Sequence, residues 1–269
     1  MIAGLRQLAA PRWLWACALA LLAPHPALGQ AEPGPIGGSL AATSDYIYRG
    51  VSQSDGHGAL QADLHAGSAG GLFGGVWAST RDSNLEPGTD GEVQVYLGQR
   101  FSFGGDWSAT VSGRSDYFVG GAAHHSDDYQ ELSAALTWLD RYTVSISAIP
   151  NAVRYSTVVY QYEGYPYEYY AVYRSAAFVA DTAAQWLLRE GVFGGGGLYL
   201  TAAAGYYYAS RPDHHAAQAV DYVYGNAGLA LEWRRWRIDL GYFAAQTQAA
   251  ELFPYPVAKR LAATVSWQF

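Results

Sequence analysis

The segment that decides the fold is residues 260–269, RLAATVSWQF, at the end of the chain. Apolar residues occupy every second position of this segment, and small or polar residues lie between them. Successive side chains of a β-strand point to opposite faces of a sheet, so this alternation predicts a strand with one apolar and one polar face. The apolar face carries Leu261, Ala263, Val265, Trp267 and Phe269.

The same period of two recurs along most of the chain, for example over residues 107–114, 142–148 and 237–244. We expect about twelve such strands, within a range of ten to fourteen, beginning near residues 38, 58, 71, 91, 106, 128, 141, 168, 197, 221, 236 and 258. Residues 176–197 are compatible either with a continued strand or with a short helix. A chain of alternating strands without helical periodicity predicts an all-β fold.

The connections between these strands alternate in length. Tight turns fall at 69–71, 104–105, 139–141 and 234–236, and longer polar connections at 51–58, 81–91, 120–128, 150–167, 210–220 and 246–259. Aromatic residues gather near both ends of the strands. Short turns on one side, long loops on the other and two aromatic bands are typical of bacterial outer-membrane barrels. We therefore predict a transmembrane antiparallel β-barrel with short periplasmic turns and longer extracellular loops.

Composition agrees with a membrane barrel and excludes other classes. Charged residues make up 14% of the chain, against about 25% in soluble domains, and 22 residues are tyrosine. The mean hydropathy of −0.06 is too low for a helical membrane protein. The formal net charge of −7 argues against a nucleic-acid partner.

The N-terminus predicts a secretory signal peptide. Arg6 and Arg12 precede the apolar run 13–23, and small residues follow over 27–31. We expect cleavage after Gly29 or Ala31, which divides the chain into a signal peptide, 1–31, and a barrel domain, 32–269. The only cysteine, Cys17, lies within the signal peptide, so the exported protein is expected to form no disulfide.

Residues 44–54, SDYIYRGVSQS, together with residues 75–79, GVWAS, resemble the opening of the TorF family of porin-like proteins, also called Gcw_chp. Val265, Trp267 and Phe269 resemble the C-terminal signal that the barrel-insertion machinery reads. The resemblance implies an outer-membrane barrel of a Gram-negative bacterium with a channel role, and it supplies no catalytic residues.

Charged residues on the inward-facing positions are candidates for lining a pore. They are Arg49, Arg100, Arg114, Glu131, Glu232, Arg234, Arg237 and Asp239. In a channel they would form rings of mixed sign that set ion preference, whereas in a filled barrel they would form interior ion pairs. We favour a water-lined lumen because strands rich in Ser, Thr, Gly and Ala leave space. For Arg49, which precedes Gly50, a lumenal position and a solvated loop base both stay open.

Other polar clusters predict no enzyme or metal site. His124-His125 and His214-His215 are adjacent pairs, whose side chains point opposite ways on an extended chain and chelate one ion poorly. His65 and Asp63 occur without a hydrolase motif. The tyrosine-rich stretch 155–173 is interpreted as a strand that rises beyond the membrane, with a sugar-stacking surface or a constriction loop as alternatives.

The sequence therefore predicts a non-enzymatic porin, without cofactor or metal, that passes small polar solutes or ions by passive diffusion. Its expected partners are outer-membrane lipid and lipopolysaccharide, the barrel-insertion machinery and the solutes themselves. Two alternatives stay open, a plugged structural or adhesive barrel and an outer-membrane lipid-modifying enzyme.

Overall fold

The computed structural model describes residues 36–82, 89–120, 128–162, 165–212, 218–253 and 255–269, with backbone alone over 156–171. The predicted signal peptide, 1–31, lies outside the described residues, as do His124, His125, His214 and His215. Within the described ranges, no helix has the length and apolar character needed to cross a membrane.

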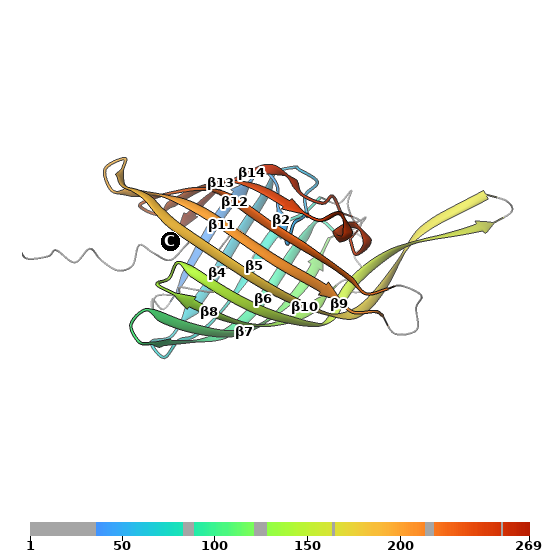
Figure 1. Cartoon of the computed structure of the whole chain (residues 1–269), viewed down its shortest axis with the longest axis horizontal. Helices are drawn as coiled ribbons and strands as arrows, with labels where there is room; N and C mark the ends of the chain where they lie inside the picture. Colours follow the sequence, from blue (N-terminus) through green and yellow to red (C-terminus); the bar gives the residue numbers. More distant parts are fainter. Residues whose placement is uncertain (1–35, 83–88, 121–127, 163–164, 213–217, 254) are drawn as a thin grey trace, which may run out of the picture.

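Twelve antiparallel strands close into one barrel, each paired with its neighbours in the chain and the last paired with the first (Figure 1). The barrel strands are β1 (Gly37–Thr43), β4 (Ala59–Gly67), β5 (Leu72–Thr80), β6 (Gly91–Phe103), β7 (Trp107–Val119), β8 (Tyr129–Trp138), β9 (Tyr142–Tyr162), β10 (Tyr165–Val192), β11 (Gly196–Ala209), β12 (Val220–Trp233), β13 (Trp236–Ala245) and β14 (Lys259–Gln268). The predicted fold class and strand count are confirmed.

The seam between the first and last strands completes the hydrogen-bond ladder. Ser39 pairs with Gln268 and Thr43 with Thr264. Beyond the strand, Phe269 and Gly38 exchange backbone bonds of 3.1 and 3.2 Å. In hydrocarbon an unpaired backbone group costs several kcal/mol, so only a closed sheet can span the membrane.

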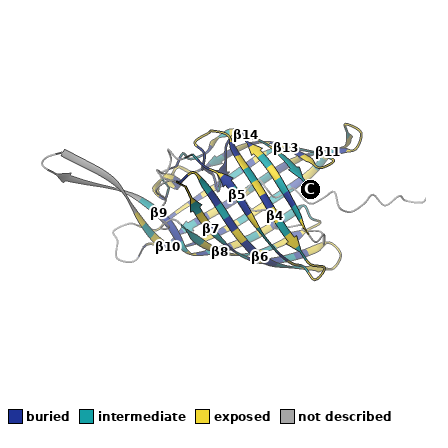
Figure 2. Cartoon of the chain, turned by 180° about the vertical axis from the view of Figure 1, so that it is seen from behind, coloured by how far each residue is buried: buried dark blue, intermediate teal, exposed yellow. Residues whose placement is uncertain are grey.

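Burial alternates along the barrel strands wherever their side chains are described, as the stripes in Figure 2 show. The outward residues are large and apolar, and many are more than half exposed: Leu97 is 61% exposed, Leu132 62%, Ile146 65% and Leu261 64%. A soluble protein does not leave such a continuous apolar belt in water. The outer wall of the barrel is therefore a lipid-facing surface, and the period of two in the sequence comes from this lipid–lumen alternation.

Aromatic rings form a continuous row at the short-turn end of the barrel. Trp107 stacks on Trp138 at a centroid distance of 6.0 Å, Trp138 on Tyr142 at 5.4 Å, and Tyr142 meets Trp186 edge to face at 6.2 Å. Rings of this kind favour the boundary between lipid tails and water. The row marks one membrane interface.

Strands β9 and β10 are much longer than the others and continue past the long-loop end as a two-stranded ribbon (Figure 1). The connection predicted at 150–167 is therefore strand wherever it is described, in agreement with the favoured interpretation of the tyrosine-rich stretch. Residues 176–192 continue strand β10, so the helical alternative is wrong there. Register shifts near Arg189 and Val192 accommodate the end of this strand.

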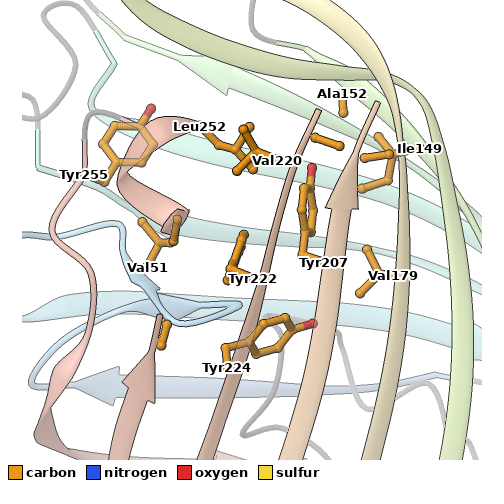
Figure 3. Close-up of a cluster of buried hydrophobic side chains, with 14 residues drawn as sticks. Val51, Ile149, Ala152, Val179, Tyr207, Val220, Tyr222, Tyr224, Leu252 and Tyr255 are labelled. Carbon is orange, nitrogen blue, oxygen red and sulfur yellow. The ribbon is translucent and has the colours of Figure 1, made fainter. Parts of the chain in front are cut away.

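Two long connections fold partly inward, although some of their residues, such as His57 and Gln248, stay exposed to solvent. The first, 44–58, contains the short hairpin β2 (Ile47–Tyr48) and β3 (Val51–Ser52), and the second, 246–258, contains the 3-10 helix η2 (Thr247–Glu251). The long polar connection predicted at 51–58 is buried over its first residues, where Val51, Ser52 and Ser54 are at most 2% exposed. Val51 and Leu252 pack against the inner wall formed by β9 to β13 (Figure 3).

Candidate functional site

The middle of the barrel interior is lined by small side chains. Inward-facing Ser133, Ala135, Ser145, Ala183 and Ala203 are only half-buried, although they face away from lipid. Their accessible surface must therefore open to the lumen. The barrel interior contains water-accessible space at this level.

The hairpin β2–β3 is held across the long-loop end by its own hydrogen bonds and by the 246–258 segment. The Ser52 amide donates to the Pro256 carbonyl at 2.9 Å, and the Ala258 amide donates to the Gly50 carbonyl at 2.8 Å. Inside the loop, the Asp45 carboxylate accepts hydrogen bonds from the hydroxyls of Ser52, at 2.5 Å, and Ser54, at 3.1 Å.

Gly50 fits the hairpin for two reasons. Its φ is +78°, a left-handed conformation that favours glycine. A Cβ at this position would lie 2.5 Å from the Ala245 Cβ and 2.8 Å from the Tyr224 Cβ. The hairpin backbone at Gly50 therefore packs directly against the barrel wall.

The bend brings Arg49 onto the opposite wall of the lumen, where a layer of charged residues crosses the barrel; we call it the charge layer. It consists of Arg49, Arg81, Glu92, Arg114, Asp116 and Glu131. The Glu131 carboxylate binds both Arg49, at 2.7 Å, and Arg114, at 2.9 Å. Arg114 Nε lies 3.0 Å from the Asp116 carboxylate. All six residues are at most 9% exposed. Three guanidinium groups face three carboxylates, so the layer has no net formal charge.

Tyrosines of the hairpin extend this layer. The Tyr46 hydroxyl donates to Glu92 at 3.0 Å, and the Tyr48 hydroxyl accepts from Arg114. Burial, reinforced by the nearby Glu92 carboxylate, raises the pKa of Tyr46 well above its usual value, so its hydroxyl stays a donor. Burial alone lowers the pKa of Arg49, but Glu131 together with Tyr48, Tyr224 and Asp181 outweighs burial, so the pKa lies above the ordinary arginine value. The contact between hairpin and wall is therefore an ionic one.

On the long-loop side of the charge layer lies a cavity of about 600 Å³, a volume that includes space open to solvent; we call it the vestibule. Its lining combines Arg49, Arg81, Glu92 and Gln53 with aromatic residues and a few aliphatic ones. The aromatic residues are Tyr48, Phe118, Tyr129, Tyr155, Tyr207, Tyr222, Phe253 and Tyr255. Arg49 and Arg81 also lie over rings, at 4.8 Å from Tyr48 and 4.6 Å from Phe118.

A second charged cluster lies near the short-turn end. Arg237 contacts Glu232 at 2.5 Å and Asp239 at 2.7 Å, and is 3% exposed. Arg100 pairs with Asp140 at 2.8 Å, at the turn itself. The small lumenal residues thus lie between two charged levels.

The structure separates the predicted pore-lining residues. Arg49, Arg114 and Glu131 come together in the charge layer, and Glu232, Arg237 and Asp239 in the second cluster. Arg234 differs: it is exposed in the β12–β13 turn, has a φ of +57° and lies 4.6 Å over the Trp233 ring. Its assignment to the lumen is wrong, because the alternation of inward and outward residues ends where the strand ends at Trp233.

Several residues of the charge layer and vestibule were missed from the sequence. Glu92 and Asp116 have the same inward parity as Arg100 and Arg114, so the alternation could have identified them. Arg81 lies beyond the end of β5, where parity carries no information. The 246–258 segment also gave no signal, because its burial depends on contacts with residues far away in the chain.

The His65–Asp63 pair does form, with His65 Nδ1 2.5 Å from Asp63 and the Tyr96 hydroxyl donating to the same carboxylate at 2.7 Å. Within the described part of the chain, no serine hydroxyl bonds to His65, and no group of three or more His, Cys, Asp or Glu residues is placed to hold a metal ion. The pair faces the lumen rather than the lipid, where a lipid-modifying enzyme would act.

Val265, Trp267 and Phe269 lie on the lipid-facing side of β14 and just beyond it, and the Trp267 and Phe269 rings stack at 5.2 Å. They are presented together at the seam and the short-turn end. Their role as a signal in assembly stays a prediction.

Comparison with known proteins agrees with this geometry. Residues 27–177 match a family described as bacterial protein of unknown function (Gcw_chp), and no curated protein matches the chain. The fold is similar to that of the NanC porin in a rhombohedral crystal form, with 9% identity, a TM-score of 0.50, and coverage of 86% of this chain and 98% of that one.

Two further solved structures have lower scores. The KdgM porin in complex with disordered oligogalacturonate has 10% identity and a TM-score of 0.46, over 87% of this chain and 98% of that one. The outer membrane protein OprD from Pseudomonas aeruginosa has 9% identity and a TM-score of 0.38, over 79% of this chain and 59% of that one. At these identities the likeness to the NanC porin concerns the fold alone: the chain is a porin-like barrel.

Proposed function

The chain belongs to the Gcw_chp family of bacterial proteins, and from its porin-like barrel we propose that it is an outer-membrane porin through which small polar solutes or ions diffuse passively. The solutes would enter at the long-loop end, pass the charge layer when the hairpin moves, and leave through the short-turn end. The proposal assigns no catalytic residue, metal or cofactor.

One observation supports this proposal most directly: the small lumenal residues around Ser133 and Ala203 are accessible although they face inward. A barrel that served only as a scaffold could fill this level with large side chains, as small barrels commonly do. Ser, Thr and Ala here leave space and supply hydroxyl groups for a hydrated solute. The charge layer, with balanced signs, would restrict size more than it selects an ion.

The proposed location is the outer membrane of a Gram-negative bacterium. It is supported by the lipid-facing belt, the aromatic row and the short-turn and long-loop asymmetry, all of which are expected of that class. Export would require the signal peptide at 1–31 and leave the barrel domain, 32–269. Insertion would use the machinery that reads Val265, Trp267 and Phe269, in a membrane that contains phospholipid and lipopolysaccharide.

Conductance tests the proposal. The protein is purified, refolded in detergent and added to a planar bilayer, and a shift in gel mobility on heating confirms that the barrel has folded. We expect discrete current steps that scale with salt concentration and are small or infrequent because the charge layer is closed in the structure. Folded protein that gives no steps, even in variants with a loosened hairpin, would contradict a porin role.

A plugged structural or adhesive barrel is the second candidate, and the buried charge layer favours it. Glu131 and Asp116 are at most 1% exposed, so this level of the described structure is closed. The two candidates differ in whether the hairpin leaves its place. A structural barrel would stay closed when the contact between Arg49 and Glu131 is removed, and a porin would open.

A further inference from the structure

The vestibule has the composition of a binding site rather than of a simple entrance. Its rings come from three parts of the chain: the β2–β3 hairpin, the 246–258 segment and the barrel wall. Figure 3 shows Tyr255 of the 246–258 segment together with Tyr207 and Tyr222 of the wall. Tyr207 stacks on Tyr222 at 5.4 Å, and Tyr155 meets Tyr255 edge to face at 5.9 Å. A concave, mainly aromatic lining with a few polar groups is typical of small-molecule sites.

Several polar groups of this lining already have partners within the protein. Arg49 Nη2 is bound to Glu131, Gln53 Nε2 to the Val51 carbonyl, and the hydroxyl of Tyr255 donates to that of Tyr155. A sugar carries a hydroxyl on most ring carbons, and each one needs a partner when it is buried. The vestibule offers few free partners, so a polyhydroxylated solute fits it poorly.

Two polar groups are different. In the part of the chain that the structure describes, the Tyr222 hydroxyl and Arg49 Nε have no hydrogen-bond partner, although Tyr222 is 0% and Arg49 3% exposed. Buried polar groups are normally satisfied, and an unsatisfied one in a cavity wall indicates a place for a ligand atom. Both groups donate hydrogen bonds, so the matching ligand atom is an acceptor oxygen.

The charge of the lining selects the sign of the ligand. Among the lining residues that the structure describes, two guanidinium groups, of Arg49 and Arg81, face the cavity with one carboxylate, that of Glu92. The guanidinium groups already cover the faces of Tyr48 and Phe118, where an organic cation would otherwise bind. An anion is therefore favoured over a cation.

We propose that the vestibule binds a small aromatic carboxylate, whose ring packs among the tyrosines and whose carboxylate accepts hydrogen bonds from Arg49 and Tyr222. This site goes beyond the proposed passage. A blocked barrel can bind the ligand without conducting, and a conducting barrel can lack the site.

Benzoate is the probe, and its binding is measured by titration calorimetry on the folded protein in lipid nanodiscs. We expect saturable binding of one benzoate per chain. Tyr222→Phe removes a hydroxyl that has no partner among the described residues, so folding should be unchanged while benzoate affinity falls about tenfold. Tyr206→Phe is the matched control, because Tyr206 faces outward from the neighbouring strand and is 42% exposed; its benzoate affinity should equal that of the unmodified protein.

Three results would overturn this proposal. They are absence of saturable benzoate binding, equal affinities in the Tyr222→Phe and unmodified proteins, and binding of glucuronate or cyclohexanecarboxylate as tight as that of benzoate. Because binding is measured without a membrane potential or a current, these results are independent of whether the barrel conducts.

Discussion

Glu131→Gln tests whether the charge layer closes the barrel. Glu131 is the carboxylate shared by Arg49 of the hairpin and Arg114 of the wall, and its side chain is 0% exposed. The amide keeps the shape and removes the charge. Arg114 keeps Asp116, whereas Arg49 loses its only ion-pair partner among the described residues.

The substitution changes two different free energies, that of global unfolding and that of hairpin movement. Global unfolding loses both ionic contacts, and breaking a buried ion pair costs about 3–5 kcal/mol. Of the two ionic contacts of Glu131, hairpin movement loses only the one with Arg49, a hydrogen bond between charged groups worth about 1.5–3 kcal/mol. Since about 1.4 kcal/mol corresponds to a factor of ten, the open population should rise roughly 10- to 100-fold.

Single-channel recording measures the opening frequency, and urea unfolding in lipid vesicles measures stability. Glu232→Gln is the matched control, because Glu232 pairs with Arg237 on the adjacent wall strand and contacts no hairpin residue in the described structure. It should lower stability without changing the opening frequency. Glu131→Gln that loses stability but opens no more often than the unmodified protein would refute the hairpin as a gate. Equal opening in both variants would show general loosening instead.

Three further predictions test other parts of the structure. Gly50→Ala should displace the hairpin from the barrel wall and raise conductance. Gly105→Ala should leave conductance unchanged, because Gly105 has nearly the same φ, +77°, but no atom lies within 4 Å of a new Cβ there. Equal effects of the two substitutions would exclude the steric explanation. Leu97→Arg places a charge in the lipid-facing belt and should destabilise the barrel by about 2–4 kcal/mol in urea titrations. Ala135→Arg places the same charge in the lumen and should alter conductance but not the yield of folded protein. Similar folding losses in both variants would contradict the assigned faces. Deletion of Phe269 should reduce the heat-modifiable, folded fraction in outer membranes more than it reduces unassisted folding in vesicles, and equal losses would assign Phe269 to the seam alone.

The wall of the barrel was predictable because one rule acts on every residue of it. Lipid lies on one side and the lumen on the other, so the alternation in segments such as 260–269 fixes both the strands and the faces. Arg114 and Glu131 were identified in this way, and Glu92 and Asp116 follow the same parity. The lipid–lumen alternation does not apply to Arg234, because Arg234 lies beyond the end of a strand.

The interior could not be predicted in the same way. Arg49 and Glu131 are 82 positions apart, and their contact depends on how the hairpin bends into the closed barrel. Val51 is buried by residues of the 246–258 segment, with which it forms a bridge at Val257. The sequence of 44–58 is polar enough to be solvated, and only the closed wall around it supplies the partners that make its burial favourable.

The aromatic row at the short-turn end makes the intrinsic fluorescence of the protein a one-sided reporter. Of the tryptophans in the described residues, Trp107, Trp138, Trp186, Trp233, Trp236 and Trp267 lie at that end, and Trp77 faces the interior, 5% exposed, against Tyr46 of the hairpin loop. Lipids brominated at defined depths would quench the first group according to how far the short-turn interface has crossed the bilayer. Trp77 is shielded from those lipids, so its residual emission would follow the neighbouring Tyr46 and thereby the position of the loop. One spectrum can thus separate insertion from rearrangement of the interior without any attached label.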